Sequence, residues 1–102
     1  MSIGFIGCGN MATAIIKGII KSKTVDENEI NVFDVYAPAV EKLTAEYKIN
    51  KCESECDVVS SSDAVILAVK PNVLPQVLNK INTTLEESDT LLISIAAGKS
   101  KR

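Results

Sequence analysis

The amino-acid sequence predicts an α/β fold, in which helices cover both faces of a doubly wound parallel sheet. Short apolar runs alternate along the chain with segments that have the periodicity of amphipathic helices. Such alternation is typical of parallel sheets with right-handed crossovers. The run at residues 64–69 consists of six consecutive apolar residues, as expected for a central strand that is covered on both faces. A chain of 102 residues is long enough for one domain, so residues 1–102 are expected to form a single unit.

Five segments are predicted as strands because each is a short run rich in apolar residues. They cover residues 3–6, 30–34, 49–52, 64–69 and 90–95. The last strand is expected to end at Ala96-Ala97-Gly98. Residues 22–29 are polar and are expected to form a loop, whereas residues 53–62 could hold one or two helical turns.

Three helices are predicted from apolar periodicity. In the first, over residues 11–21, polar Thr13, Lys17 and Lys21 recur every four positions. This pattern leaves one broad apolar face, formed by Ala14, Ile15, Ile16, Ile19 and Ile20.

The other two helices have recognisable first turns. Pro38 fits the first turn of the second helix, because its fixed φ suits that position. The apolar face of this helix comprises Val40, Leu43 and Tyr47. Asn72 is expected to cap the third helix. Its apolar face comprises Leu74, Val77, Leu78 and Ile81.

Composition argues against several classes of partner. The net charge is −2, and basic residues gather only at the very end of the chain, so nucleic-acid binding is not expected. The chain shows neither a secretory signal pattern nor an apolar run long enough to span a membrane, and a cytoplasmic location is expected. There is no histidine, and Cys52 and Cys56 lack a second ligand pair, so no metal site is predicted.

Residues 7–12, Gly-Cys-Gly-Asn-Met-Ala, match the pattern G-x-G-x-x-G/A. Gly7 permits the sharp turn out of the first strand, Gly9 leaves room for a pyrophosphate, and Ala12 allows close packing of helix on strand. The free N–H groups and the dipole of the helix that follows favour the negative charge of phosphates. The motif lies between a predicted strand and a predicted helix, which favours a Rossmann-type dinucleotide site over a merely structural turn.

Asp34 ends the second predicted strand, 25 residues after Gly9. An acidic residue at this place typically accepts hydrogen bonds from the adenosine ribose, which favours NAD, unless Asp34 is simply a solvated acid in a turn. Tyr36 could pack against the adenine or be an ordinary surface aromatic residue.

Two further segments follow predicted strands and are expected at the same edge of the sheet. Ala68-Val69-Lys70-Pro71 should lie near the nicotinamide, with Lys70 either beside the cofactor or simply exposed. Small residues in Ser94-Ile95-Ala96-Ala97-Gly98 would let a flat ring approach, although they also suit tight packing. Without histidine the chain has no imidazole acid or base, which favours reduction of a C=N bond over that of a ketone.

These three blocks, residues 6–12, 68–71 and 94–98, together resemble the N-terminal domain of pyrroline-5-carboxylate reductases over essentially the whole chain. The resemblance implies reduction of Δ1-pyrroline-5-carboxylate to L-proline by NADPH or NADH, in proline biosynthesis. It also implies the cofactor-contacting residues, which are Ile6, Gly7, Cys8, Gly9, Asn10, Met11, Ala68, Val69, Lys70, Pro71, Ile95, Ala96 and Ala97. No catalytic residue is assigned within this segment, although Lys70 should lie near the nicotinamide.

The chain departs from this family in two ways. Asp34-Val35 stands where members often have a small polar or basic pair for NADPH, so the choice of cofactor stays open. The C-terminal helical domain, which dimerises the family and supplies much of the imino-acid site, is expected to be absent. We therefore expect this segment alone to bind dinucleotide without turnover, and the full-length form to be a homo-oligomer. Two alternatives are a β-hydroxyacid-type dehydrogenase domain and a non-catalytic nucleotide-binding module.

Overall fold

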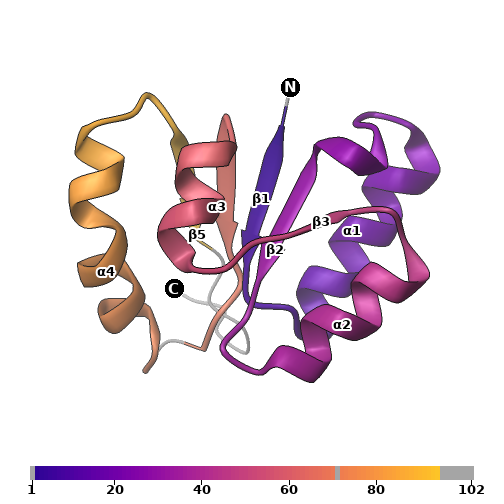
Figure 1. The fold of residues 1–102 in the computed structure, drawn as a ribbon, viewed down its shortest axis with the longest axis horizontal. Coiled ribbons are helices and arrows are strands. Elements are labelled where there is room, and N and C mark those ends of the chain that lie inside the picture. The colour runs from indigo at the N-terminus through magenta and orange to yellow at the C-terminus, as the bar shows by residue number, and fades with distance from the viewer. Residues whose placement is uncertain (1, 71, 95–102) are drawn as a thin grey trace, which may run out of the picture.

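The computed structural model describes residues 2–70 and 72–94 and contains a five-stranded parallel sheet (Figure 1). The strand order is β3-β2-β1-β4-β5. The strands are β1 (Ile3–Ile6), β2 (Ile30–Phe33), β3 (Asn50–Lys51), β4 (Ala64–Leu67) and β5 (Leu91–Ser94). The α/β, doubly wound Rossmann-type prediction is confirmed, since this order grows outward on both sides of β1. Several strands are shorter than predicted, and Asp34, Ala68 and Val69 lie just beyond strand ends.

The middle strand of the sheet is β1, and β4 is an interior strand beside it, which agrees with the prediction of a strand covered on both faces within residues 64–69. An apolar run indicates that a strand is buried on both faces, as every interior strand of a parallel sheet is. It does not indicate the place of that strand in the strand order. Strand β4 lies between β1 and β5, and Ile66 within it is only half-buried.

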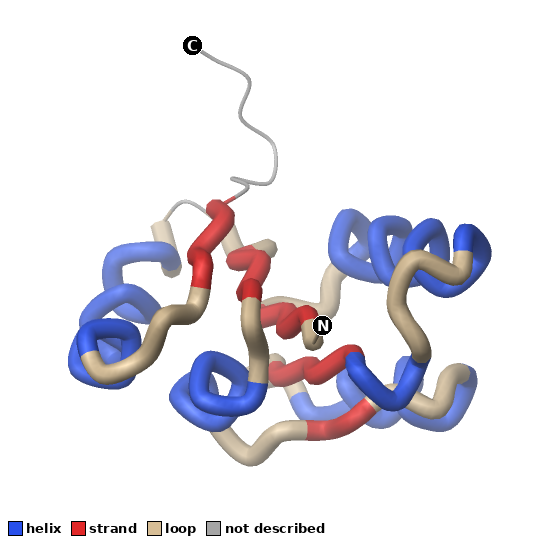
Figure 2. The backbone as a smooth tube through the Cα atoms, turned by 90° about the horizontal axis from the view of Figure 1, so that it is seen from above, coloured by secondary structure: helices blue, strands red, loops and turns tan. Residues whose placement is uncertain are grey.

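Helices lie on both faces of the sheet (Figure 2). One face carries α1 (Asn10–Ser22) and α2 (Ala37–Glu46), and the other carries α3 (Glu55–Ser61) and α4 (Leu74–Glu86). Neighbouring residues of β1 point to opposite faces, as in any strand. Phe5 therefore packs with Ile16 of α1, and Ile6 joins the core beneath α3 and α4.

The helices differ from the predicted ones in a few places. The polar segment 22–29, predicted as loop, contains the short 3-10 helix η1 (Glu27–Glu29), because a single helical turn needs no apolar periodicity. Tyr47 lies at the C-cap of α2, although its side chain still packs on the core. Ala14 and Leu78 are exposed, although both were predicted to belong to the buried apolar faces of their helices.

Asn72 does not cap α4, because Val73 occupies the N-cap position. The N–H groups of Val73 and Leu74 both donate to the carbonyl of Lys70, at 2.9 and 3.1 Å. A capping side chain would need the N–H of the second or third helical residue. The second is Pro75, which has none, and the N–H of Gln76 donates to Val73.

One part of the sheet surface is not covered by the described residues. Leu91 and Ile93 of β5 are 59% and 42% exposed. Among the described residues, no helix is both long enough and apolar enough to cross a bilayer.

Candidate functional site

The site forms at the ends of two neighbouring strands, where the chain leaves each strand for a helix on the opposite face of the sheet from the other. Ile6 at the end of β1 pairs with Leu67 at the end of β4, so both strands stop at the same level. The chain then leads from β1 to α1 on one face and from β4 to α4 on the other. In open α/β sheets, ligands bind in the crevice at such a switch point.

A cleft of about 740 Å³ lies at this point. It is lined by Gly7, Gly9, Met11, Asp34, Val35, Ala68, Val69, Lys70 and Val73. Seven of these nine were predicted to contact cofactor, and the structure brings them together from the ends of three strands.

Gly7 is required by the fold itself. Its φ is +103°, a conformation that other L-residues rarely adopt. A Cβ atom at Gly7 would lie 2.4 Å from the carbonyl oxygen of Ala68, where no real contact is possible. The N–H of Gly7 also donates to the carbonyl of Phe33 at 2.8 Å, which ties the turn to β2. This glycine therefore lets the two loops at the switch point meet.

Neither the backbone conformation nor packing requires a glycine at position 9. Its φ of −77° and ψ of −168° are available to any residue, and a Cβ atom there would have no described atom within 4 Å. Gly9 is the N-cap of α1, whose first N–H groups have no partner within the helix. The first turn also carries no acidic residue. The cleft therefore has an uncapped, positive helix end and open space above it, which suits a phosphate group.

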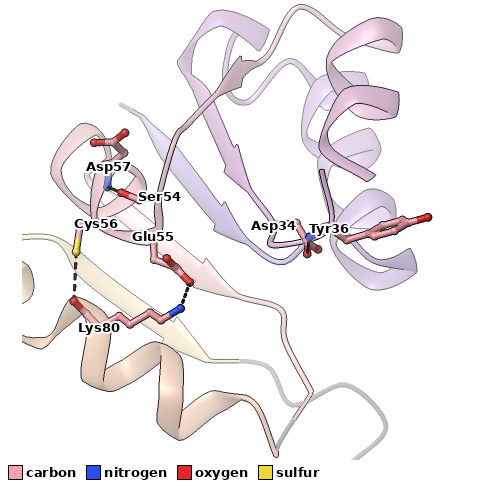
Figure 3. A network of polar contacts seen from close by, with 7 residues as sticks. All are labelled: Asp34, Tyr36, Ser54, Glu55, Cys56, Asp57 and Lys80. Carbon is pink, nitrogen blue, oxygen red and sulfur yellow. Dashed lines mark hydrogen bonds and ion pairs between the residues drawn. The ribbon is translucent and has the colours of Figure 1, made fainter. Parts of the chain in front are cut away.

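Asp34 links the glycine-rich turn to the loop after β2. Its Oδ2 accepts the N–H of Cys8 at 2.7 Å, and its Oδ1 accepts the N–H of Tyr36 at 2.9 Å. The half-buried carboxylate thus fixes both loops, and Figure 3 shows it beside Tyr36 at the end of β2. Each carboxylate oxygen has a second lone pair, so Asp34 can still accept bonds from a ribose.

Lys70 is exposed and lines the cleft, and its carbonyl closes the turn before α4. Met11, 43% exposed, contributes an apolar wall from α1. The cleft thus combines a helix end and backbone amides with apolar walls, a combination suited to holding a dinucleotide.

Other predicted residues lie elsewhere or are not described. The side chain of Ile6 is buried in the core under the cleft. Cys8 is also buried, and desolvation, followed by the charge of Asp34, raises the pKa of its thiol to about 12. Asn10 begins α1, but its side chain is not described. Pro71 and the segment 95–97 (Ile95, Ala96 and Ala97) lie outside the described residues.

Two lining residues were missed by sequence reasoning. Val35 is 79% exposed although apolar, and Val73 meets the cleft from the turn before α4. An apolar residue directly after Asp34, the acid predicted to bind the ribose, was the available signal for Val35. No pattern in the sequence pointed to Val73, because only the turn before α4 brings this residue to the cleft.

A buried carboxylate, Glu55, lies beneath the cleft and was also missed. It is 7% exposed and, with Val35 and Val73, lines a small cavity of about 40 Å³. Lys80 of α4 pairs with it at 3.4 Å (Figure 3). Within the described ranges, no three acidic, cysteine or histidine residues lie together as a metal site would require.

The model of the family described as NADP oxidoreductase, coenzyme F420-dependent, matches residues 2–98. The chain belongs to this family. Within it, the resemblance to the N-terminal domain of pyrroline-5-carboxylate reductases is confirmed. Over 99 residues, the chain is 42% identical to the pyrroline-5-carboxylate reductase of Escherichia coli, an alignment that covers 94% of this chain and 35% of the relative.

Solved structures of similar proteins agree with this assignment. A pyrroline-5-carboxylate reductase from Coxiella burnetii superposes with a TM-score of 0.86 at 30% identity, over 97% of this chain and 36% of the other. The Plasmodium falciparum pyrroline carboxylate reductase with NADP bound gives 0.80 at 26% identity, over 97% and 34%. The chain thus spans about a third of the length of these relatives.

Proposed function

We propose that this chain is the dinucleotide-binding part of a pyrroline-5-carboxylate reductase, which reduces Δ1-pyrroline-5-carboxylate to L-proline with NAD(P)H. The observation that carries the proposal is Gly9, a glycine that the fold does not require and that opens onto the helix end in the cleft. The 42% identity to the E. coli enzyme supports the choice of reaction.

The described residues fit a dinucleotide. The pyrophosphate would lie against the first turn of α1 above Gly9, and the adenosine ribose would lie at Asp34. Val35 and Val69 supply apolar surface for a flat ring. When bound, the nicotinamide supplies the hydride that reduces the substrate. The part of this chain is to bind and orient the cofactor. Of the two titratable side chains that line the cleft, Asp34 already accepts two backbone N–H groups, and Lys70 would lie near the nicotinamide.

The imino-acid substrate would be bound mainly by parts of the protein that this chain does not contain. A protonated C=N bond accepts hydride with little further proton transfer, which fits a chain without histidine. The exposed Leu91 and Ile93 fit a domain whose sheet is completed by further polypeptide. We accordingly expect this segment alone to bind cofactor without turnover, and the longer protein to be oligomeric.

Titration of the 102-residue chain with NADH and NADPH, followed by nicotinamide fluorescence, tests the cofactor site. Saturable binding of either cofactor is expected, and no binding of either would overturn the proposal. A longer protein that contains this segment should oxidise NAD(P)H when pyrroline-5-carboxylate is added. Oxidation of β-hydroxyacids with NAD(P)+, without imine reduction, would favour the hydroxyacid dehydrogenase alternative.

A further inference from the structure

A second hollow, of about 520 Å³, lies between α1 and α2. We call it the α1–α2 groove. Residues from four segments line it, including Cys8, Thr13, Lys17, Tyr36, Lys42 and Glu46. The function proposed above makes no use of Lys17, Lys42 or Thr13.

The groove adjoins the cofactor cleft. Cys8 lines the groove, and its neighbours Gly7 and Gly9 line the cleft. Tyr36 likewise lines the groove, while Val35 lines the cleft. The glycine-rich turn and the loop after β2 therefore each border both hollows. Asp34, which bonds the N–H groups of both Cys8 and Tyr36, holds these two segments together.

The charges in the groove favour an anion. Lys17 and Lys42 are exposed, and neither has an ion-pair partner among the described residues. The Thr13 hydroxyl adds a neutral donor. Glu46 is the one acid in the lining, so two cations face one carboxylate. Lysine ammonium groups are common partners of phosphate.

The anion that would reach this groove is a phosphate on the adenosine ribose of the cofactor. The ribose of the adenosine half would lie at Asp34, on the boundary between the two hollows, and NADPH carries a phosphate on its 2′ oxygen. The charge of Asp34 opposes that phosphate, yet both of its oxygens already accept backbone N–H groups, which satisfies part of its charge. A 2′ substituent at this boundary would lie next to the groove, whose lining includes Tyr36.

We propose that the 2′-phosphate of NADPH binds in the α1–α2 groove, where Lys17 and Lys42 neutralise it. This inference rests on the proposed cofactor site. It makes two helix-face lysines, rather than residues of the loop after β2, the determinants of NADPH binding. A site of this kind accepts NADPH in spite of an acid at the end of β2.

The test compares cofactor affinities of the wild-type chain and of Lys17→Met/Lys42→Met. The double substitution should weaken NADPH about tenfold or more and flatten its dependence on salt, while NADH changes less than twofold. Lys21→Met/Lys51→Met removes the same charge outside the groove and should change neither affinity. Circular dichroism confirms that both variants fold.

Competition with small nucleotides tests the groove without substitution. Adenosine 2′,5′-bisphosphate should displace a bound cofactor at lower concentration than 5′-AMP in the wild-type chain, and this advantage should vanish in Lys17→Met/Lys42→Met. Equal losses for NADH and NADPH in that variant, or no loss for either, would overturn the inference while the cofactor site stands. A wild-type chain that binds NADH but not NADPH would overturn it as well. Failure to bind either cofactor would instead refute the proposed function itself.

Discussion

The carboxylate of Asp34 and the backbone N–H of Cys8 form a 2.7 Å hydrogen bond across 26 positions of sequence. With the 2.9 Å bond to Tyr36, it makes Asp34 the residue that joins the glycine-rich turn to the loop after β2. The same carboxylate is the proposed partner of the adenosine ribose. One side chain thus shapes the cleft and is also the proposed contact for its ligand.

Asp34→Ala should weaken NADH more than NADPH. Removal of the carboxylate removes the ribose acceptor for both cofactors, but for NADPH it also removes repulsion of the 2′-phosphate. The ratio of the two dissociation constants, measured by fluorescence titration, checks this. Asp34→Asn keeps an oxygen and the side-chain size without the charge, so it should shift the ratio in the same direction with a smaller loss for NADH. Equal losses for both cofactors in both variants would contradict the ribose role.

Gly9→Val should abolish dinucleotide binding and leave the domain folded. The backbone at Gly9 is extended, and no described atom lies within 4 Å of a Cβ atom there, so the free energy of unfolding should fall by no more than about 1 kcal/mol. The valine side chain would fill the space of the pyrophosphate. Urea denaturation and cofactor titration of the same preparation measure the two effects.

Gly18→Ala is the matched control for that variant. Gly18 lies inside α1, and a Cβ atom there also meets open space. Alanine should raise the stability by about 0.5–1 kcal/mol because it favours the helix. Affinity for cofactor should not change. Wild-type affinity in Gly9→Val would show that the space above Gly9 is not used.

Much of this fold was predictable because its signals are local. The strand run at 3–6, the glycines that follow it and Pro38 in the second helix each act through their immediate neighbours, and all three were placed correctly. The glycine motif and the segments after two other predicted strands together predicted most of the cleft lining, since a parallel sheet brings its strand ends to one edge.

The errors and omissions concern features that tertiary structure decides. Asn72 has the chemistry of a cap, but Lys70 and Pro75 leave it no free N–H to accept. Leu78 has the right period for burial, but it is 37% exposed among the described residues. Lys17 and Lys42 belong to different helices, and no spacing in the sequence indicates that they line one groove.

Gly7→Ala should destabilise the whole domain. The new Cβ atom would lie 2.4 Å from the Ala68 carbonyl oxygen, and φ of +103° is itself unfavourable for alanine. Together these effects should lower the free energy of unfolding by more than about 2 kcal/mol. Urea denaturation measures the loss. A stability within about 0.5 kcal/mol of wild type would show that the two loops do not meet as described.

The stability of the domain should fall at alkaline pH because two buried thiols resist ionisation in the folded state. Desolvation is the main reason that the pKa of Cys8 rises from 9.0 to about 12 and that of Cys52 from 9.0 to about 11. Below pH 9 both thiols are neutral in the folded and unfolded chain, so the full stability is present. Above pH 9 only the unfolded chain ionises, and stability is lost as the pH rises toward 11 and 12.

Denaturation series at pH 8 and pH 10 measure this loss, which should be about 1 kcal/mol for each thiol. Cys8→Ala should be less stable than wild type at pH 8, because a buried group is removed, but should lose less stability between the two pH values. Cys52→Ala should likewise lose less stability than wild type between the two pH values. If Cys8→Ala and wild type decline equally, the Cys8 thiol ionises as freely in the folded chain as in the unfolded one, and burial beside Asp34 does not control it.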